Sequence, residues 1–266
     1  MDGARTDQAA LVSSVRIRRC RLVASLAWAL VAACSGAPRH PVDTAPLALE
    51  ALEIHVDEGA GPLVVFLHGY GSAPETFLGL AERTDLPAGT GFVLPRAPLP
   101  IPDHDAGTMW WPLPAHFADI GRGPMPGAAD ARASVARLLD RAQGSYRDRP
   151  LVLGGFSQGA MVALDLALHD PRPIAGLVLM SGTMIDEPDT LARLDARRGL
   201  RVYASHGRLD SVLAYGGDLR LVDAMRDHGL DVHFTSFEGD HEVTPEVSTE
   251  VAAFIRDSVP RQRPPG

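Results

Sequence analysis

The sequence predicts an α/β fold in which a mostly parallel, doubly wound sheet carries helices on both faces. Continuous apolar runs, such as residues 63–67 and 174–180, have the pattern of strands that are buried on both sides. Helical segments separate these runs, and strands that alternate with helices form parallel sheets. The chain has 266 residues, 45% of them hydrophobic, which is enough for the core of one such domain.

The first part of the domain supplies three expected strands and one helix. Residues 53–56 alternate in polarity, which suits an edge strand, and residues 63–67 form a buried one. Pro74 can open a helix that runs to about residue 84, because the first helical N–H needs no partner. Residues 91–94 form the next strand.

Residues 95–126 form a long proline-rich loop. Eight prolines stand among these 32 residues, and no regular element is compatible with that density. A loop of this length inside a compact domain is usually functional, so it is a candidate wall or lid of a pocket. Trp110 and Trp111 lie in it and either fill the core beneath the loop or contact a ligand.

The second half of the chain alternates helices and strands. Residues 128–142 have the spacing of an amphipathic helix, and residues 151–168 predict a strand, a sharp turn and a helix. Residues 160–168 are apolar almost all round, which places that helix in the middle of the fold. The later elements are strands at 174–180, 200–204 and 232–237, helices at 188–198 and 218–228, and a last helix opened by Thr244 and Pro245.

The charge of the chain argues against nucleic acid as a partner. The formal net charge is −8, and residues 1–33 hold five arginines and two aspartates, or +3, so the remainder carries −11. A folded part this acidic repels phosphate groups and also disfavours docking on an anionic surface.

The N-terminus predicts export. Four arginines between residues 16 and 21 precede an uncharged apolar run at residues 22–33, which suits a secretory signal and is short for a spanning helix. The run ends in Val-Ala-Ala before Cys34, which resembles a bacterial lipoprotein lipobox. That resemblance implies that Cys34 becomes the lipidated first residue of a membrane-anchored lipoprotein in the bacterial cell envelope. The alternatives are an uncleaved hydrophobic anchor, or ordinary signal cleavage nearby.

We therefore divide the chain into four parts. Residues 1–33 are the expected signal peptide, 34–48 a flexible tether, 49–260 a single α/β domain and 261–266 a disordered tail. The two cysteines, Cys20 and Cys34, both precede the domain, so it has no disulfide framework.

Ser157 stands in a Gly-x-Ser-x-Gly pattern between the strand and the helix of residues 151–168. A serine hydroxyl is a weak nucleophile, so it must be exposed, held still and placed beside a base. A tight strand-to-helix turn lifts the serine above the sheet edge, while Gly155 and Gly159 leave room for the crowded backbone. The helix N-terminus then directs free N–H groups at an oxyanion. The alternative is a glycine-rich turn whose serine only caps the helix.

An acid and a base follow Ser157 in the order of the α/β-hydrolases, Ser then Asp then His. Asp210 lies in the loop after the strand expected at 200–204, and His241 in the loop after 232–237. Each falls at the carboxyl end of a strand, as Ser157 does, so three loops converge on one rim.

Several other residues could be considered for these roles. The acid could come instead from the segment after the strand expected at 174–180. Three other histidines are expected to be structural because of where they lie in the predicted helices and strands. The acids are Asp186, Glu187 and Asp189, and the histidines are His169, His228 and His233.

Two further segments carry polar candidates. The strand at 63–67 runs into His68-Gly69-Tyr70, which is either a ligand-binding loop or a plain turn, with His68 a structural hydrogen-bonding residue. A metal site could be imagined at Asp103, His104, Asp105 and His116, but their spacing matches no motif with a mechanism. We expect a solvated loop there, and predict no metal and no cofactor.

Four segments, in the order LHGYGS, LGGFSQGA, SHGRLD and EGDHEV, resemble the phospholipase/carboxylesterase family, which includes the acyl-protein thioesterases. The resemblance spans residues 49–258 and implies an α/β-hydrolase fold. It implies Ser157 as nucleophile, Asp210 as the acid and His241 as the base.

The same resemblance implies how a substrate is held. The backbone N–H groups of Tyr70 and Gln158 would form the oxyanion hole, and it is the backbone of Gln158, not its side chain, that we expect to matter. The pair Trp110 and Trp111 resembles the aromatic patch of the family's substrate groove.

The implied function is a serine hydrolase that cleaves carboxylic esters through an acyl-enzyme. The substrate would be a small ester with a short or medium acyl chain, or a lysophospholipid-like molecule. One alternative is a thioesterase or peptidase, because the triad does not choose the leaving group. Another, from a different class, is a catalytically silent binding protein on the same fold.

Overall fold

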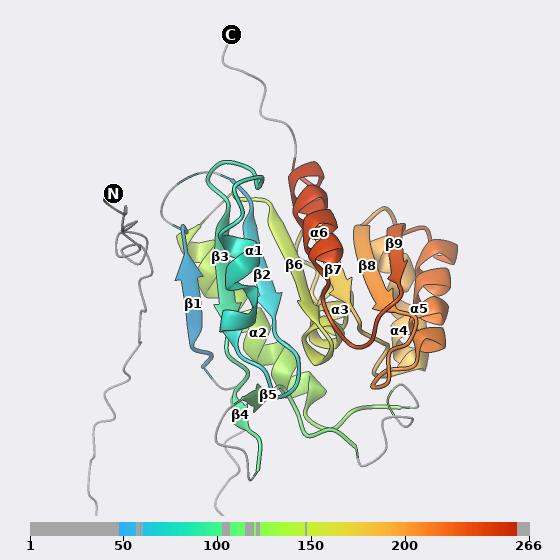
Figure 1. The fold of residues 1–266 in the computed structure, drawn as a ribbon. Helices are drawn as coiled ribbons and strands as arrows, with labels where there is room; N and C mark the ends of the chain where they lie inside the picture. Colours follow the sequence, from blue (N-terminus) through green and yellow to red (C-terminus); the bar gives the residue numbers. More distant parts are fainter. Residues whose placement is uncertain are drawn as a thin grey trace, which may run out of the picture.

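The computed structural model describes residues 48–56, 59, 61–102, 107–114, 120, 123–146 and 148–259. Seven strands form one sheet in the order β1-β3-β2-β6-β7-β8-β9, in which only the pair β1 and β3 is antiparallel (Figure 1). The strands are β1 (Ala51–Ile54), β2 (Leu63–Leu67), β3 (Gly91–Pro95), β6 (Leu151–Phe156), β7 (Gly176–Met180), β8 (Arg201–Gly207) and β9 (Asp231–Phe237). The mostly parallel sheet predicted from the apolar runs is confirmed.

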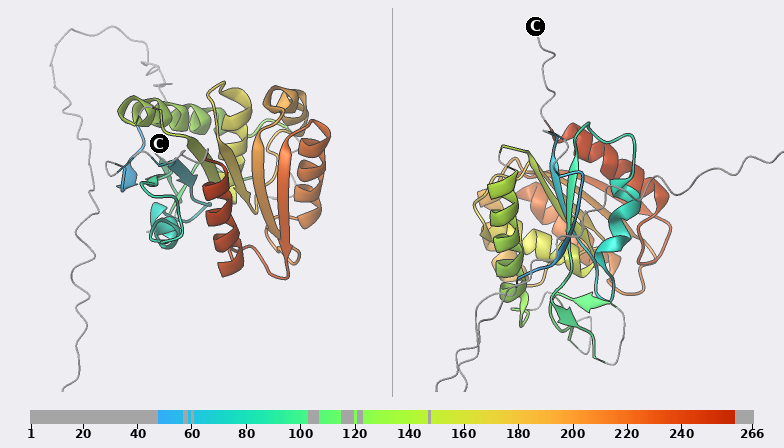
Figure 2. Two further views of the ribbon diagram at one scale, coloured as in Figure 1. Left: turned by 90° about the horizontal axis from the view of Figure 1, so that it is seen from above. Right: turned by 90° about the vertical axis from the view of Figure 1, so that its left-hand side faces the viewer.

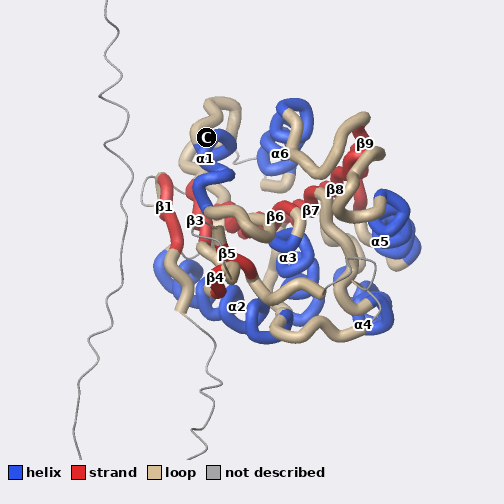
Figure 3. Tube along the Cα trace, turned by 60° about the horizontal axis from the view of Figure 1, so that its bottom comes forward, coloured by secondary structure: helices blue, strands red, loops and turns tan. Residues whose placement is uncertain are grey.

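Helices cover both faces of the sheet, as Figures 2 and 3 show. One face carries the 3-10 turn η1 (Pro74–Phe77), α1 (Leu78–Ala81) and α6 (Pro245–Asp257). The other carries α2 (Ala128–Ser145), α3 (Gln158–His169), α4 (Glu187–Arg193), the 3-10 turn η3 (Leu194–Arg197) and α5 (Tyr215–Asp227). The doubly wound arrangement is therefore also confirmed.

The buried strand β2 shows how the sequence pattern makes two cores. Val64 and Phe66 pack with the α1 and α6 side, whereas Leu63, Val65 and Leu67 pack with the α2 and α3 side. Successive side chains of a strand point to opposite faces, so a run of five apolar residues is required when both faces are covered.

Two expectations about irregular segments were wrong. Strand β8 does not end at residue 204 but continues to Gly207, because its parallel pairing with β9 persists to that residue. The proline-rich segment also contains regular structure, the short antiparallel pair β4 (Leu99–Pro100) and β5 (Thr108–Met109). A proline is tolerated there because the pair is only two residues long and lies outside the main sheet.

The remaining elements exist where they were expected, with shifted ends. The helix expected over 74–84 is η1 followed by the single-turn α1, and the helix expected over 188–198 is α4 followed by η3. Strand β1 begins at Ala51, and α5 begins at Tyr215. Local capping sets some of these ends: the Asp186 carboxylate accepts the N–H of Asp189 and so starts α4 at Glu187.

The strand order reverses beside β2. The chain continues from β2 to β3 on one side, and β6 pairs with β2 on the other. Ligands of open parallel sheets bind at the carboxyl ends of the strands next to such a reversal. The turn after β6, which holds Ser157, lies at that position.

Candidate active site

Ser157 forms a strained turn between β6 and α3. Its backbone has φ 54° and ψ −121°, a left-handed conformation rare for residues other than glycine, and its N–H donates to the Met180 carbonyl at 2.8 Å. The end of β2 packs directly against this turn. A Cβ at Gly155 would lie 2.5 Å from the Leu67 carbonyl oxygen, and one at Gly159 would lie 1.9 Å from it. The predicted need for two flanking glycines is therefore confirmed.

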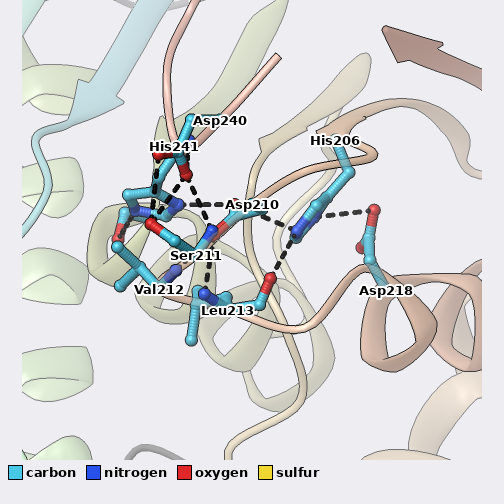
Figure 4. A network of polar contacts seen from close by, with 9 residues as sticks. His206, Asp210, Ser211, Val212, Leu213, Asp218, Asp240 and His241 are labelled. Carbon is cyan, nitrogen blue, oxygen red and sulfur yellow. Dashed lines mark hydrogen bonds and ion pairs between the residues drawn. The ribbon is translucent and has the colours of Figure 1, made fainter. Parts of the chain in front are cut away.

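His241 connects Ser157 to Asp210. Its Nε2 lies 2.8 Å from Ser157 Oγ. Its Nδ1 lies 2.7 Å from Asp210 Oδ2 (Figure 4). The Asp210 side chain is 0% exposed and that of His241 is 14% exposed. The ring of Phe156 covers the imidazole, with centroids 4.8 Å apart. The structure thus brings together the serine, histidine and aspartate that the sequence singled out from three separate loops.

The loop of Asp210 holds its carboxylate in place. Oδ1 accepts the backbone N–H groups of Val212 at 2.9 Å and Leu213 at 2.7 Å, which leaves Oδ2 to face the imidazole. Ionised, Oδ2 can only accept, so Nδ1 of His241 carries the proton between them and Nε2 is free to accept from the serine.

Asp240, next to His241, has a role that the sequence did not reveal. Its Oδ1 accepts from the His241 backbone N–H at 2.8 Å and from the N–H and hydroxyl of Ser211 at 2.7 and 2.9 Å. The backbone N–H of Ser211, followed by its hydroxyl and the His241 N–H, lowers the pKa of this carboxyl. Asp240 therefore fastens the loop of His241 to the loop of Asp210. Its carboxylate contacts the backbone N–H of His241 and not the imidazole.

Two backbone N–H groups flank Ser157. Gln158 is the first residue of α3, so its N–H has no acceptor within the helix. The carbonyl of Gly69 accepts from Ser72 N–H at 3.2 Å and from His68 Nδ1 at 2.8 Å. The peptide is planar, so fixing this carbonyl also fixes the direction of the Tyr70 N–H. The loop lies close to Ser157, since a Cβ at Gly69 would be 3.2 Å from that of Ser157.

His68 supports this loop from below. It is fully buried, and its Nε2 accepts the Ala97 N–H at 3.0 Å while Nδ1 donates to Gly69 O. Burial lowers the pKa of His68 from its ordinary value of 6.5, which matches a ring whose Nε2 must remain unprotonated. Its expected role as a structural hydrogen-bonding residue is confirmed.

Trp110 and Trp111 lie in the core, which corrects the prediction that they contact substrate. Each residue is only 1% exposed. Trp110 Nε1 donates to the His68 carbonyl at 2.8 Å, so the indole is an internal support of the same loop. Of the two positions considered from the sequence, the structure favours filling the core for both residues. The indole N–H of Trp110 has a partner there, whereas the buried Nε1 of Trp111 has no hydrogen-bond partner among the described residues.

The side chain of Gln158 holds this tryptophan segment. Its Oε1 accepts the Trp110 N–H at 2.9 Å, and its Nε2 donates to the Trp111 carbonyl at 2.8 Å. The side chain of Gln158 therefore has a structural role that the sequence did not indicate, because a buried segment of irregular backbone needs hydrogen-bond partners that the sequence pattern does not reveal. The oxyanion role of its backbone N–H stays a prediction.

The other candidate acids and histidines do not contact this triad. Asp186 caps α4, and His169 lies 3.0 Å from Asp189 and 3.1 Å from Asp165. His233 stacks on Tyr203, with centroids 5.7 Å apart, and His228 pairs with Asp195. The structural roles expected for these histidines are confirmed.

Some predicted features lie outside the described residues. These are Cys34, the signal segment, and the segment with Asp103, His104, Asp105 and His116. Within the described ranges, three or more His, Cys, Asp or Glu side chains do not gather in a group able to hold a metal ion. In the same ranges the helices are too short or too polar to cross a membrane.

Comparison with known proteins identifies the family. The sequence model of the phospholipase/carboxylesterase family matches residues 53–259. The chain belongs to this family. Acyl-protein thioesterase 1 of Mycosarcoma maydis is 28% identical to this phospholipase/carboxylesterase over 243 residues, which cover 80% of the chain and 99% of the relative.

Solved structures agree with the phospholipase/carboxylesterase assignment. The crystal structure of esterase PE8 has a TM-score of 0.71 at 27% identity, covering 80% of this chain and 100% of that one. A carboxylesterase from Mesorhizobium loti, at 19% identity, shares the fold with a TM-score of 0.66, covering 81% and 96%. The chain has the α/β-hydrolase fold and is a hydrolase enzyme, as the four sequence segments implied.

Proposed function

We propose that this phospholipase/carboxylesterase is a serine hydrolase that cleaves carboxylic esters, with Ser157, His241 and Asp210 as its catalytic triad. The observation that carries the proposal is the continuous hydrogen-bonded line from Ser157 Oγ through the imidazole to Asp210 Oδ2, at 2.8 and 2.7 Å. This is the geometry required of a nucleophile, a base and a group that orients the base.

The reaction follows from the proton positions. His241 Nε2 takes the proton of Ser157 Oγ as that oxygen attacks the ester carbonyl, and Asp210 stabilises the imidazolium that results. The N–H groups of Tyr70 and Gln158 receive the negative charge that develops on the carbonyl oxygen. Collapse of the tetrahedral species protonates and releases the alcohol, and water then hydrolyses the acyl-enzyme by the same steps.

The rim of the site supports an apolar acyl group. Within the described part of the chain, four large hydrophobic side chains are exposed: Tyr70 (41%), Leu209 (67%), Val212 (36%) and Val243 (37%). Each is within two residues of Asp210 or His241, or is the oxyanion residue itself. Apolar surface gathered at one site is a mark of ligand binding. A short or medium acyl chain, or the chain of a lysophospholipid-like ester, fits this surface.

A second candidate is a thioesterase. Curated relatives are named acyl-protein thioesterase 1, and the same triad can expel a thiolate as readily as an alkoxide. Peptidase activity would use the same geometry, with an amine as the leaving group.

The test is a series of p-nitrophenyl esters of increasing acyl length, repeated with an acyl thioester and a peptide. Ser157→Ala should lower kcat by on the order of 10⁴-fold or more, because no other group replaces the nucleophile. Ser248→Ala, on α6 and away from the triad, is the matched control and should retain full activity. Equal activity in the wild type and Ser157→Ala would refute the serine mechanism. No turnover of any substrate would support a silent binding protein instead.

We further propose that the enzyme is tethered to a membrane of the bacterial cell envelope through a lipid on Cys34. The support is the sequence alone: an arginine-rich start, an apolar run at 22–33, and Val-Ala-Ala directly before the cysteine. Buried lipid chains attach a protein without a spanning segment.

A further inference from the structure

A second buried histidine and aspartate lie behind the proposed catalytic acid. His206, on β8, has its Nε2 3.1 Å from Asp210 Oδ2, the same oxygen that faces His241 (Figure 4). Its Nδ1 lies 3.3 Å from Oδ2 of Asp218, on α5. The side chains of His206 and Asp210 are 0% exposed and that of Asp218 is 2% exposed. The series of polar contacts that begins at Ser157 therefore includes five side chains, in the order Ser157, His241, Asp210, His206 and Asp218.

The neighbours of His206 determine where its protons are. Nε2 faces the Leu213 carbonyl at 3.0 Å as well as the Asp210 carboxylate, and both can only accept, so Nε2 carries a proton. Nδ1 of His206 and Oδ2 of Asp218 are buried and make no hydrogen bond to the described residues, but they face each other at 3.3 Å, an ion-pair distance. A single proton must therefore lie between these two atoms, because two unshared lone pairs facing each other in the core would be costly.

The direction of both titrations agrees with one shared proton. Burial alone would lower the pKa of His206, but the Asp218 carboxylate, then the Leu213 carbonyl and Asp210, raise it above its ordinary value. Burial raises the pKa of Asp218 against the opposing effect of the imidazole. Both shifts therefore favour a proton held between the two groups.

We propose that His206 and Asp218 are positioning residues for the hydrolysis proposed above. Through Nε2–H, His206 holds Asp210 Oδ2 in line with the imidazole of His241, and Asp218 keeps His206 protonated for that purpose. Three hydrogen bonds, from the Val212 and Leu213 N–H groups and from His241, and the ion-pair contact with His206 at 3.1 Å fix the orientation of the Asp210 carboxylate. The proposal rests on the triad being catalytic.

The surroundings of His206 contain few other charges. Two residues of α5 contact His206: Asp218, and Tyr215, whose ring centroid lies 6.0 Å from that of the imidazole. Asp210 contacts it from the loop that follows β8. From β9 its partner in register is the uncharged Ser236. Arg208 turns outward to Ser236 and Glu238, and is exposed. The two aspartates therefore dominate the electrostatics of this ring.

A charged His206 also changes the electrostatics around Asp210. An imidazolium 3.1 Å from Asp210 Oδ2 partly offsets the negative charge of that carboxylate, and a neutral His206 does not. The carboxylate that orients His241 is therefore held by a charge as well as by hydrogen bonds.

The decisive variant is Asp218→Asn, whose amide can still donate to His206 Nδ1 but leaves the ring neutral. The readouts are kcat and KM with a p-nitrophenyl ester, and the rate of Ser157 labelling by a fluorophosphonate, both from pH 5 to 9. We expect the plateau of kcat and the labelling rate to fall about 10- to 100-fold with KM unchanged, since the reacting groups are less well aligned.

The matched control is Asp223→Asn, which removes the same charge from an exposed position on the same helix and should behave as wild type. The proposal is overturned if the profiles of Asp218→Asn coincide with those of the control. It is also overturned if the substitution changes only KM and leaves kcat and the labelling rate unaltered. If Asp218→Asn does not fold, His206→Gln is compared with His206→Leu. Gln restores an N–H near Nε2, so it should be labelled at least ten times faster than Leu, and equal rates overturn the proposal.

Fluorophosphonate labelling separates the two proposals. It reports an activated serine whatever the natural substrate is. Wild type that is labelled but hydrolyses no ester contradicts the proposed function and leaves the positioning pair testable by labelling. Wild type that is not labelled contradicts both, because no activated serine is then present to position.

Discussion

At the scale of single residues, three buried or half-buried imidazoles differ in what they do because their neighbours differ. His68 accepts a backbone N–H and must stay neutral at Nε2. His206 lies between two carboxylates, and His241 lies between a hydroxyl and a carboxylate. The same side chain is thus a structural support at position 68, a proposed positioning group at 206 and a proposed base at 241, and the polar neighbours of each ring decide which.

His68 should make the stability of the enzyme depend on pH. Its folded pKa is below its ordinary value of 6.5, so between the two values the unfolded chain binds a proton that the native protein does not. The contribution of His68 to the free energy of unfolding should therefore be fully present above pH 6.5 and should fall as the pH is lowered below that value. Urea unfolding at pH 5 to 8 measures this.

His68→Gln should flatten that dependence, because an amide oxygen can accept the Ala97 N–H and does not titrate. His233→Gln, at a largely exposed position, is the control and should keep the wild-type slope. An unchanged slope in His68→Gln would show that another group is responsible.

At the scale of elements, the active site depends on contacts between segments that are far apart in the sequence. The end of β2 touches the turn at Ser157, so glycines are required at positions 155 and 159. Gln158 joins that turn to Trp110 and Trp111, and Trp110 in turn supports the loop after β2. The loop after β2, the turn at Ser157 and the segment with Trp110 and Trp111 are therefore held together as one unit.

Gln158→Glu should loosen this unit. A carboxylate can still accept the Trp110 N–H, but it cannot donate to the Trp111 carbonyl and would be buried as a charge. We expect a loss of about 1–3 kcal/mol in the free energy of unfolding, together with a red shift of tryptophan emission. Glu82→Gln, the reverse exchange at an exposed position, should change neither. Unaltered hydrogen exchange at residues 108–111 in Gln158→Glu would contradict this role.

At the scale of the whole molecule, Arg149 holds several segments together at one end of the sheet, and the net charge bears on how the enzyme would attach to a membrane. The guanidinium of Arg149 donates to the carbonyls of Val56, Gly61, Pro62 and Gly89, so it joins the segments before β2, β3 and β6 at the end of the sheet opposite the triad.

The part of the chain after residue 33 carries a formal charge of −11, which repels anionic lipid headgroups. Attachment to a membrane would then depend on the lipid, not on the surface of the domain.

Cys34→Ser should accordingly release the enzyme from the membrane fraction of bacterial cells. The measurement is the esterase activity of soluble and membrane fractions, together with incorporation of a labelled fatty acid. Cys20→Ser is the matched control and should remain attached, because it precedes the apolar run. Retention of Cys34→Ser would indicate an uncleaved hydrophobic anchor at residues 22–33 instead.

The fold could be predicted because it follows from local patterns. Apolar runs such as Leu63–Leu67 indicate strands covered on both faces, and their alternation with helices indicates a parallel sheet. The ends of elements were less accurate, as at β8, where pairing with β9 extends the strand through His206. Strand ends depend on the partner strand, which a local pattern does not contain.

The sequence by itself determined the sheet, the strained turn at Ser157, and the three strand ends that carry Ser157, Asp210 and His241, because polar residues after buried strands must meet at one edge. Only the tertiary structure decided what surrounds them. It placed Trp110 and Trp111 in the core, made the Gln158 side chain a link, and set His206 and Asp218 behind Asp210. These roles come from hydrogen bonds between distant segments in a buried environment. Their direction depends on packing, which residue type and spacing do not specify.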